Sequence, residues 1–456
     1  MLAPFRVDQR PDPCAVITRV AISLAIVALL GALVNSARSA MQKVNKVEQG
    51  QAREVLHQVA AIIQKEYYDP TFHGFDLQAR VQQAEKQIDQ APNLAIGMGA
   101  IEWAVEGLND SHTFFVPPMR NVIVDPGWKM EMVGDQCLIY AVQQDSDAWK
   151  QHLRPGDLVL KVEIYEPRRA IFSKIDYRLT DFAPLAEYHF VVASPGQASR
   201  SLTVKSHMQT LPQTWNGFNG GDGQHQIRRL FEGYRILGET RTAKLNDNVF
   251  IWKLPEFNLK DAEIERYVDA AKRHGTLILD LRDNENGGED SLKSMIANFF
   301  DGDANGGKLI ERQGAKPLKF STRGNHAFTG KLFVLVNSQS ASASEIFARL
   351  VQLNKRGTVI GDQTAGEVGR GKYFPLHFGD ISIISYGLQV TESRFENPDG
   401  QDLEGIGVTA DVKIIPTPVD LTAGRDPVLA EAARLAGSPI SPEDAGKLFP
   451  ITWLSH

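Results

Sequence analysis

Between residues 249 and 361, runs of consecutive apolar residues alternate with segments whose apolar residues recur every three or four positions. An unbroken apolar run is typical of a strand buried on both faces of a parallel sheet, and the wider spacing is that of an amphipathic helix. The expected strands are VFIWKL (249–254), TLILDLR (276–282), KLFVLVN (331–337) and GTVIG (357–361). The expected helices are 261–275, 290–300 and 344–355. We therefore predict a mostly parallel α/β core over residues 227–440.

The remainder of the chain divides by its pattern. Helical spacing from residue 51 to about 118 predicts an amino-terminal helical module over residues 41–120. Short β-prone runs separated by turn residues predict a β-rich domain over residues 125–208. The Gly- and Asn-rich stretch that follows lacks periodicity, so residues 209–226 are expected to be a linker. Residues 441–456 are expected to form a carboxy-terminal tail.

The first 40 residues resemble a secretory signal. Arg6, Arg10 and Arg19 precede an apolar stretch from Val20 to Val34, and small residues follow it. The stretch is shorter than the roughly 20 residues that cross a bilayer as a helix. A cleaved signal and an uncleaved anchor both remain open, and either predicts an exported protein, periplasmic or secreted, whose only membrane contact is that anchor.

Composition excludes several classes of function. The net charge is −6, without a long basic run, so nucleic acid is not an expected partner. Cys14 precedes the apolar stretch, which leaves Cys137 as the single cysteine of a processed chain and allows no internal disulfide. No HExxH or CxxC spacing occurs, so neither a metal nor another cofactor is expected.

One Ser- and Ala-rich turn, SQSASASEIF, follows the predicted strand that ends at Asn337. A serine at a helix start lies among backbone N–H groups without intrahelical partners, where the helix dipole favours the negative charge of a tetrahedral intermediate. Ser342 is therefore a candidate nucleophile. Ser342 and Glu345 also fit a capping box, which requires no catalytic role.

Three further positions are candidates for a catalytic role. Gly287 and Gly288 follow another buried strand and allow backbone amides to approach a ligand, although an ordinary glycine turn fits as well. Ser111-His112 offers a general base with a hydroxyl beside it, in what is otherwise a polar turn. Glu404 precedes a predicted strand and is either a carboxylate that orients such a base or an exposed turn acid.

The order of these motifs resembles the carboxy-terminal processing, or tail-specific, peptidases and their tricorn-like and retinoid-binding relatives. The similarity runs from about Gln51 to Gly437 and rests on motifs distributed along the chain. They are YYDPTFHGFD, LNDSHTFF, HLRPGDLVLKV, DLRDNENGG, VLVNSQSASASEI, GDQTAGE and LEGIGVTADV. The resemblance implies a ClpP/crotonase-like α/β sandwich with an amino-terminal helical module and an inserted PDZ-like domain.

The family's base differs between its branches. One branch uses a lysine from a TxGKG turn, but here that position is Glu367, and Lys372 lies outside the matching position. The tricorn-like branch instead uses a Ser-His pair and a distant glutamate, which correspond here to Ser111, His112 and Glu404. The resemblance to that branch therefore implies that His112 is the base.

The implied mechanism is that of a serine peptidase. His112 takes the proton of Ser342, Ser111 contacts the imidazole and Glu404 polarises Ser111. The Ala343 amide and that of Gly287 or Gly288 receive the oxyanion. DLRDNENGG is one residue longer than the family's usual motif, so the glycine stays open. The expected partner is a peptide or unfolded protein. One alternative function is that of a non-catalytic ligand- or peptide-binding member of the family. Another is that of a different acyl hydrolase such as an esterase, which the absence of a GxSxG elbow disfavours.

Overall fold

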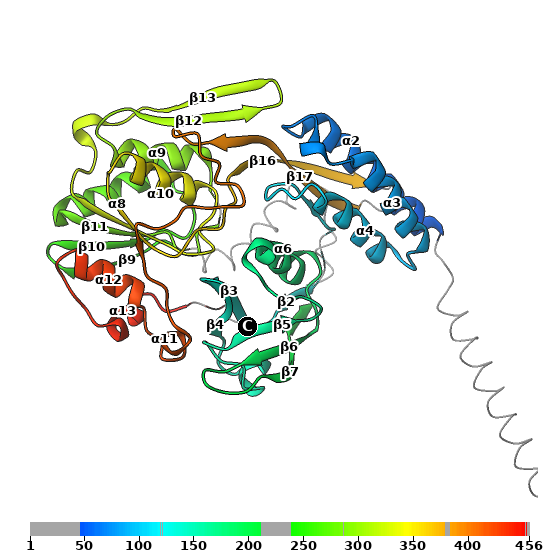
Figure 1. Ribbon diagram of the computed structural model, residues 1–456, viewed down its shortest axis with the longest axis horizontal. Helices are drawn as coiled ribbons and strands as arrows, with labels where there is room; N and C mark the ends of the chain where they lie inside the picture. Colours follow the sequence, from blue (N-terminus) through cyan, green and yellow to red (C-terminus); the bar gives the residue numbers. More distant parts are fainter. Residues whose placement is uncertain are drawn as a thin grey trace, which may run out of the picture. The chain divides into compact units, whose positions relative to one another are not determined.

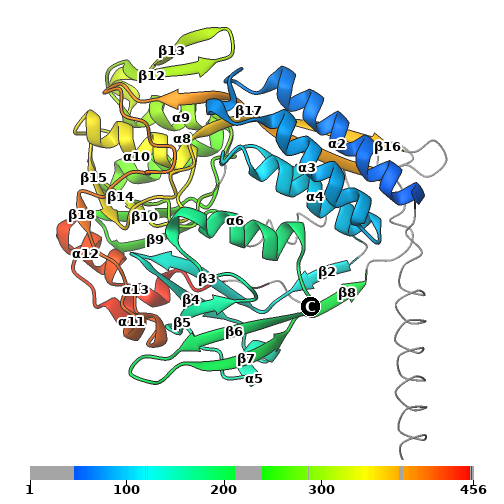
Figure 2. The same ribbon diagram turned by 45° about the vertical axis from the view of Figure 1, so that its right-hand side comes forward.

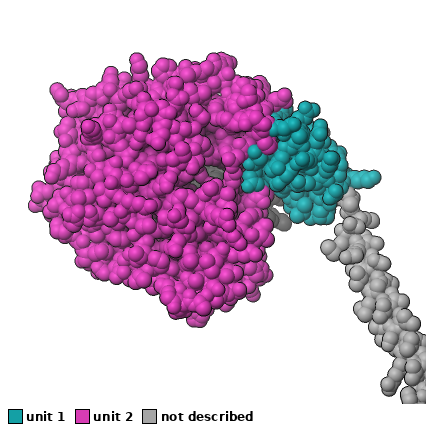
Figure 3. Space-filling model, viewed as in Figure 1, with its two compact units in different colours: residues 1–61, 76–107 teal, residues 62–75, 108–456 magenta. Residues whose placement is uncertain are grey.

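The computed structural model describes residues 46–118, 120, 122–210, 239–285, 287–378, 384–451 and 453. The predicted signal or anchor at residues 1–40 and nearly all of the predicted linker lie outside the described residues. The chain forms two compact units, one of residues 1–61 and 76–107 and the other of residues 62–75 and 108–456 (Figure 3). Within the described part of the chain, no helix is both long and apolar enough to span a bilayer.

The first unit is helical. It contains most of α2 (Lys46–Glu66), together with α3 (Leu77–Gln90) and α4 (Leu94–Glu106). Asp76 caps α3 through the amide of Ala79 at 2.9 Å. Asn93 caps α4 in the same way through Ile96 at 3.0 Å. These short polar side chains satisfy amides that have no partner within the helix, which fixes where each helix begins.

The second unit is built on a six-stranded sheet in the order β18-β15-β14-β11-β10-β9. All neighbours in it are parallel except β9 and β10. The strands are β9 (Arg241–Asn246), β10 (Val249–Lys253), β11 (Thr276–Asp280), β14 (Lys331–Val336), β15 (Thr358–Gly361) and β18 (Val412–Lys413). This confirms that the chain is a mixed α/β protein with a mostly parallel sheet.

Both faces of this sheet are covered by helices (Figure 1). Alternate strand residues such as Trp252, Leu279 and Val334 pack with the helices of one face into one apolar core. The residues between them in the strands, such as Ile278 and Leu335, point to the opposite face and pack with the helices there. The first face carries α8 (Asp261–His274), α9 (Glu289–Phe299) and α10 (Ala343–Leu353), and the second carries α12 (Pro427–Leu435) and α13 (Pro442–Leu448).

A second sheet, antiparallel, was not anticipated from the sequence. Its order is β1-β17-β12-β13, and β16 also pairs with β17. The strands are β1 (Phe114–Val116), β12 (Ala304–Glu311), β13 (Gly314–Phe320), β16 (Gly369–Phe378) and β17 (Ile384–Glu396). Because β1 pairs with β17, residues shortly after His112 are held in this sheet, beside a strand from the other end of the chain.

The β-rich segment forms a separate five-stranded sheet, β3-β4-β5-β6-β7, visible in Figure 2 with the short helix α6 (Phe172–Tyr177) beside it. Its strands are β3 (Trp128–Val133), β4 (Gln136–Val142), β5 (Leu158–Val162), β6 (Glu187–Ala193) and β7 (Arg200–Lys205), and they enclose their own apolar core. Asp362, just after β15, accepts hydrogen bonds from the Gly134 amide at 2.8 Å and from Arg169 at 2.6 Å. These bonds tie the β3–β4 turn to the parallel sheet.

Candidate active site

Ser342 lies at a sharp turn between β14 and α10. Its φ is 56° and its ψ is −114°, a conformation that costs a serine about 1–3 kcal/mol and is maintained by its surroundings. The turn is fixed on both sides of the serine, since the Ala341 amide and the Ser344 hydroxyl both donate to the carbonyl of Asn284 at 2.9 Å. Ser342 itself is half-buried between the buried residues Ala341 and Ala343.

The capping interaction at this helix comes from Glu345 rather than from the Ser342 hydroxyl. The Ser342 amide donates to the Glu345 carboxylate at 3.1 Å, whereas the Glu345 amide donates to the main-chain carbonyl of Ser342 at 3.0 Å. The hydroxyl of Ser342 is therefore not required for the cap. The capping box predicted from the sequence is thus half formed, and it does not compete with a chemical role for this serine.

Glu345 is also the buried anchor of the turn that faces Ser342. With none of its surface exposed, it accepts hydrogen bonds from the Thr364 hydroxyl at 2.6 Å and from the amides of Gly366 and Glu367, each at 2.8 Å. Burial raises the pKa of Glu345 to about 7, against the effect of these hydrogen bonds. The sequence motif indicated the helix cap but not this second role.

Ser111, His112 and Glu404 lie together. The hydroxyl oxygen of Ser111 is 2.7 Å from Nδ1 of His112, and the Ser111 amide donates to Oε1 of Glu404 at 3.2 Å. Burial lowers the pKa of His112, while the negative charges of Glu367 and Asp110 act in the opposite direction. Burial raises the pKa of Glu404, and hydrogen bonds from Val368 and from the Ser111 side chain and amide oppose this.

The four-residue segment 366–369 connects these groups to Ser342. The carbonyl of Glu367 accepts the Ser342 amide at 2.8 Å, and the Val368 amide donates to Oε2 of Glu404 at 2.9 Å. A Cβ added to Gly369 would lie 3.1 Å from Cγ and Nδ1 of His112, so the imidazole ring packs directly on this backbone. The structure therefore gathers all four predicted residues around one short segment.

Asp110 holds the histidine turn in place, and its role was not predicted from the sequence. Its carboxylate accepts the His112 amide at 3.0 Å and the Tyr67 hydroxyl at 3.0 Å. It also accepts the hydroxyl of Thr391 on β17. An acid one residue before a Ser-His pair in a turn is a weak sequence signal, because such residues are common in turns for local reasons.

The two predicted oxyanion glycines differ in how their backbone is used. The Gly288 amide donates to the carbonyl of Phe257 at 2.7 Å. Gly287 packs against Phe257 so closely that an added Cβ would lie 2.2 Å from the Cβ of that residue. The Ala343 amide belongs to the first residue of α10, where a helix provides no internal acceptor.

Lys372 has other surroundings. It lies on β16, where it pairs in register with Val390 on β17. Its Nζ is 3.7 Å from the carboxylate of Glu66 and 4.9 Å from the centre of the Phe374 ring. Half of its side chain is exposed. Neither its position in the strand nor its partners indicate a catalytic base.

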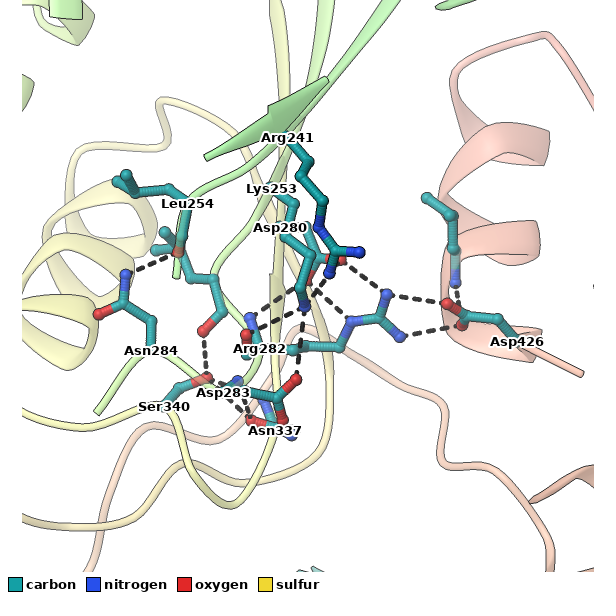
Figure 4. A network of polar contacts seen from close by, with 12 residues as sticks. Arg241, Lys253, Leu254, Asp280, Arg282, Asp283, Asn284, Asn337, Ser340 and Asp426 are labelled. Atoms are coloured by element: carbon teal, nitrogen blue, oxygen red, sulfur yellow. Dashed lines mark hydrogen bonds and ion pairs between the residues drawn. The ribbon is translucent and has the colours of Figure 1, made fainter. Parts of the chain in front are cut away.

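A buried ion-pair network lies at the carboxyl end of β11 (Figure 4). Arg282 donates to Asp280 at 2.7 Å and to Asp426, at the start of α12, at 2.8 and 2.9 Å. Although burial raises it, the pKa of Asp280 is held well below its usual range by Arg282 and Lys253. The network therefore fixes the strand end to α12.

The same network continues toward β3. The Asp283 amide donates to Oδ1 of Asn337 at 3.0 Å, and Nδ2 of Asn337 donates to Asp283 at 2.8 Å and to Glu131 at 3.0 Å. Asn337 directly follows β14 and precedes the Ser342 turn. Through Asn337, the loop that carries Ser342 is hydrogen-bonded to both the network and the β3 strand.

Comparison with known protein families agrees with this architecture. Residues 249–414 match the model of peptidase family S41. A chloroplastic C-terminal processing peptidase of Tetradesmus obliquus is 31% identical over 388 residues, which cover 79% of this chain and 77% of that protein. The chain therefore belongs to peptidase family S41, the family of the carboxy-terminal processing peptidases.

Other relatives are matched over less of their length. A probable CtpA-like serine protease of Staphylococcus haemolyticus is 27% identical over 296 residues, which cover 63% of this chain and 52% of that protein. A carboxyl-terminal-processing protease of Synechocystis is 25% identical over 61% of this chain and 58% of its own length. The chain thus spans about half the length of these curated relatives.

Solved structures share the fold. Mature CPAF complexed with lactacystin superimposes with a TM-score of 0.60 over 82% of this chain and 96% of that one, at 15% sequence identity. The photosystem II D1 C-terminal processing protease gives a TM-score of 0.52 over 87% of this chain and 99% of that one, at 20% identity. These likenesses concern the fold.

Proposed function

We propose that this protein is a serine peptidase that hydrolyses peptide bonds of exported proteins or peptides through an acyl-enzyme on Ser342. The observation that carries the proposal is the meeting of Ser342, His112 and Glu404 on the segment 366–369. A nucleophile, a base and a group that orients the base are the components that acyl transfer requires. Membership of family S41 supports the same reaction.

In the proposed reaction, His112 accepts the proton of the Ser342 hydroxyl as the oxygen attacks the scissile carbonyl. Ser111 holds Nδ1 of the imidazole, which leaves Nε2 for the nucleophile, and Glu404 orients Ser111. The resulting imidazolium then protonates the leaving amine. Water, activated by the same imidazole, releases the acid from Ser342. This arrangement corresponds to the tricorn-like branch of the family.

Two backbone amides serve as oxyanion donors in this proposal. The Ala343 amide is suited to it as the first amide of α10. Of the two glycines, Gly287 is the better second donor, because the Gly288 amide already donates to Phe257. Within the part of the chain that the structure describes, no group of three or more His, Cys, Asp or Glu side chains could hold a metal ion.

The domain assignment belongs to the same proposal. We assign residues 227–440 to a ClpP/crotonase-like peptidase core and residues 125–208 to a PDZ-like domain. The five-stranded sheet with its own core and the short helix α6 support the second assignment. Residues 1–40 would act as a signal or anchor for export. The non-catalytic alternative predicts a lost catalytic group, whereas the nucleophile, the base and the carboxylate are all present here.

The test uses a fluorophosphonate probe and a panel of unfolded and peptide substrates. We expect the probe to label Ser342, identified by mass spectrometry, and the wild-type protein to cleave the panel. Ser342→Ala should abolish both, while Ser321→Ala, at an exposed serine after β13, should retain both. Equal cleavage by the wild type and Ser342→Ala would exclude this serine as the nucleophile. Absence of both labelling and cleavage in the wild type would favour the alternative, a non-catalytic protein that binds a ligand or peptide.

A further inference from the structure

Glu367 occupies the position where lysine-dependent members of the family carry their base, and its backbone is fixed beside the proposed nucleophile. Its amide donates to the Glu345 carboxylate and its carbonyl accepts the Ser342 amide, both at 2.8 Å. A residue held at its N–H and C=O has little freedom to move its Cα. The Cα atom that carries the Glu367 side chain is therefore held in a fixed position relative to Ser342.

The Glu367 side chain lies in the electrostatic field of His112. Gly369, two residues further on, begins β16 and packs against the imidazole ring. Glu367 is two residues from this contact, and its own carbonyl is hydrogen-bonded to the Ser342 amide. Burial lowers the pKa of His112 and raises the pKa of Glu367, and the attraction between the two opposite charges acts against both shifts.

The proposed relay leaves a charge to be compensated. When His112 takes the proton of Ser342 it becomes an imidazolium, and burial disfavours that charge. The partner of its Nδ1 is the hydroxyl of Ser111, a neutral group, whereas the Glu404 carboxylate contacts Ser111. A relay with a carboxylate directly on the imidazole stabilises this cation far better. Here the imidazolium depends on carboxylates that do not bond the ring nitrogen, and Glu367 is the first of these, followed by Asp110.

We infer that Glu367 is a positioning residue whose carboxylate stabilises the protonated imidazole of His112 during acylation. The inference rests on the proposed peptidase mechanism. It also gives a physical reason why a glutamate stands where the lysine branch has its base: a cation at this position would oppose the imidazolium, while an anion supports it.

The charged groups that act directly on His112 and Glu367 are carboxylates, and Lys129 acts on the more remote Asp176 and Glu285. Asp110 faces His112 from its own turn and Glu404 faces Glu367. Ser173 on α6 hydrogen-bonds the Glu367 side chain. Burial is the main cause of the raised pKa values of Asp176, also on α6, and Glu285, from the loop after β11, and the charge of Glu367 adds to both shifts. Removing Glu367 therefore takes one negative charge from the site, and the remaining anions set the residual effect on His112.

A direct test measures the pKa of His112 by NMR in the Ser342→Ala protein, where no turnover is needed. The imidazole signal is identified by its loss in His112→Gln. Glu367→Gln should lower the pKa of His112 by about one unit, the shift typical of losing a nearby opposite charge. Glu166→Gln removes the same charge from an exposed side chain that does not contribute to the shift of His112, and it should leave the pKa unchanged. An unchanged or raised pKa in Glu367→Gln would overturn the inference.

Kinetics on the Ser342-containing enzyme provide the second readout. Glu367→Gln should reduce kcat/KM about tenfold or more and move the acid limb of its pH profile to lower pH, since the imidazole then titrates at a lower pH. Glu367→Asp keeps the charge and should recover part of both. A lower plateau with an unmoved acid limb would indicate a merely structural role. Cleavage that survives Ser342→Ala would instead refute the peptidase mechanism itself, so the two failures are distinguishable.

Discussion

The hydroxyl oxygen of Ser111 lies 2.7 Å from Nδ1 of His112, and the amide of the same serine donates to Glu404 at 3.2 Å. A hydrogen bond at Nδ1 selects the tautomer in which Nε2 accepts a proton. Ser111 therefore links the Glu404 carboxylate to the imidazole of His112, the proposed base, across 292 positions of the chain.

Loss of this link should slow acylation. Ser111→Ala removes the partner of Nδ1, so we expect kcat/KM to fall on the order of a hundredfold. Ser111→Thr keeps a hydroxyl and should retain more activity. Steady-state kinetics with one peptide substrate and the rate of fluorophosphonate labelling measure the effect. An alanine variant as active as the wild type would show that Ser111 does not orient the imidazole.

A methyl group at Gly369 should displace the imidazole. The added Cβ of Gly369→Ala would lie 3.1 Å from the His112 ring, closer than a normal contact, so the ring must shift from its position on β16. We expect kcat/KM to fall at least about tenfold, since small displacements of a catalytic group have large effects on rate. Thermal stability should change little.

Gly371→Ala is the matched control on the same strand. Its added Cβ would lie 2.5 Å from Nε2, 2.8 Å from Cγ and 2.9 Å from Cδ of Gln389, and this flexible side chain can turn away as a whole. This variant should retain most of the activity. If both alanine variants were equally active, the packing of His112 on Gly369 would not be important for the reaction.

The bonds between Arg282 and Asp426 should contribute to stability. Asp426→Ala leaves the partly buried Arg282 guanidinium without one of its two carboxylates and removes the cap that Asp426 provides to the Leu429 amide at 2.9 Å. The expected loss is about 3 kcal/mol in the free energy of unfolding. Asp426→Asn retains an acceptor for the cap and should lose less. Urea denaturation measures both, and an alanine variant as stable as the asparagine variant would contradict the account.

Glu131 should make stability depend on pH. It is 8% exposed, and burial, followed by the charge of Asp283, raises its pKa to about 8. The native state thus keeps a proton that the unfolded chain releases near pH 4.5. The stability that Glu131 contributes through this proton is complete below pH 4.5 and is lost as the pH rises through 8.

Glu131→Gln imitates the protonated side chain and should therefore flatten the fall in stability between pH 5 and 9. The difference from the wild type should grow with pH and reach on the order of 3 kcal/mol. Burial also raises the pKa of Asp176 to about 7, and this group adds to the slope in both proteins. Urea midpoints across this range test the prediction, and parallel curves for the two proteins would contradict it.

The parallel sheet was predictable because its signal is local. VFIWKL, TLILDLR and KLFVLVN are continuous apolar runs, and each forms a strand buried by helices on both faces. The antiparallel sheet was not predictable in the same way. Its strands β1 and β17 come from positions 114 and 384 onward, and pairing over that distance leaves no periodic signal in either segment.

The candidate site was likewise predictable only where its signal is local. The turn before α10 indicated Ser342, but Glu345 appeared only as a capping residue, although it also holds Thr364, Gly366 and Glu367. Gly369 carries no sequence signal, because its importance lies in contact with an imidazole from 257 positions earlier in the numbering. The family resemblance indicated Ser111, His112 and Glu404 as partners of Ser342. Their proximity depends on the fold and could not be read from the sequence.

The central claim is that His112, and not Lys372, activates Ser342. The most direct measurement compares the acylation rates of His112→Ala and Lys372→Ala, from burst kinetics or fluorophosphonate labelling, with that of the wild type. We expect His112→Ala to be slower by about two to four orders of magnitude, the usual contribution of a general base. Lys372→Ala should remain close to the wild type. Loss of acylation in Lys372→Ala with its retention in His112→Ala would contradict the mechanism.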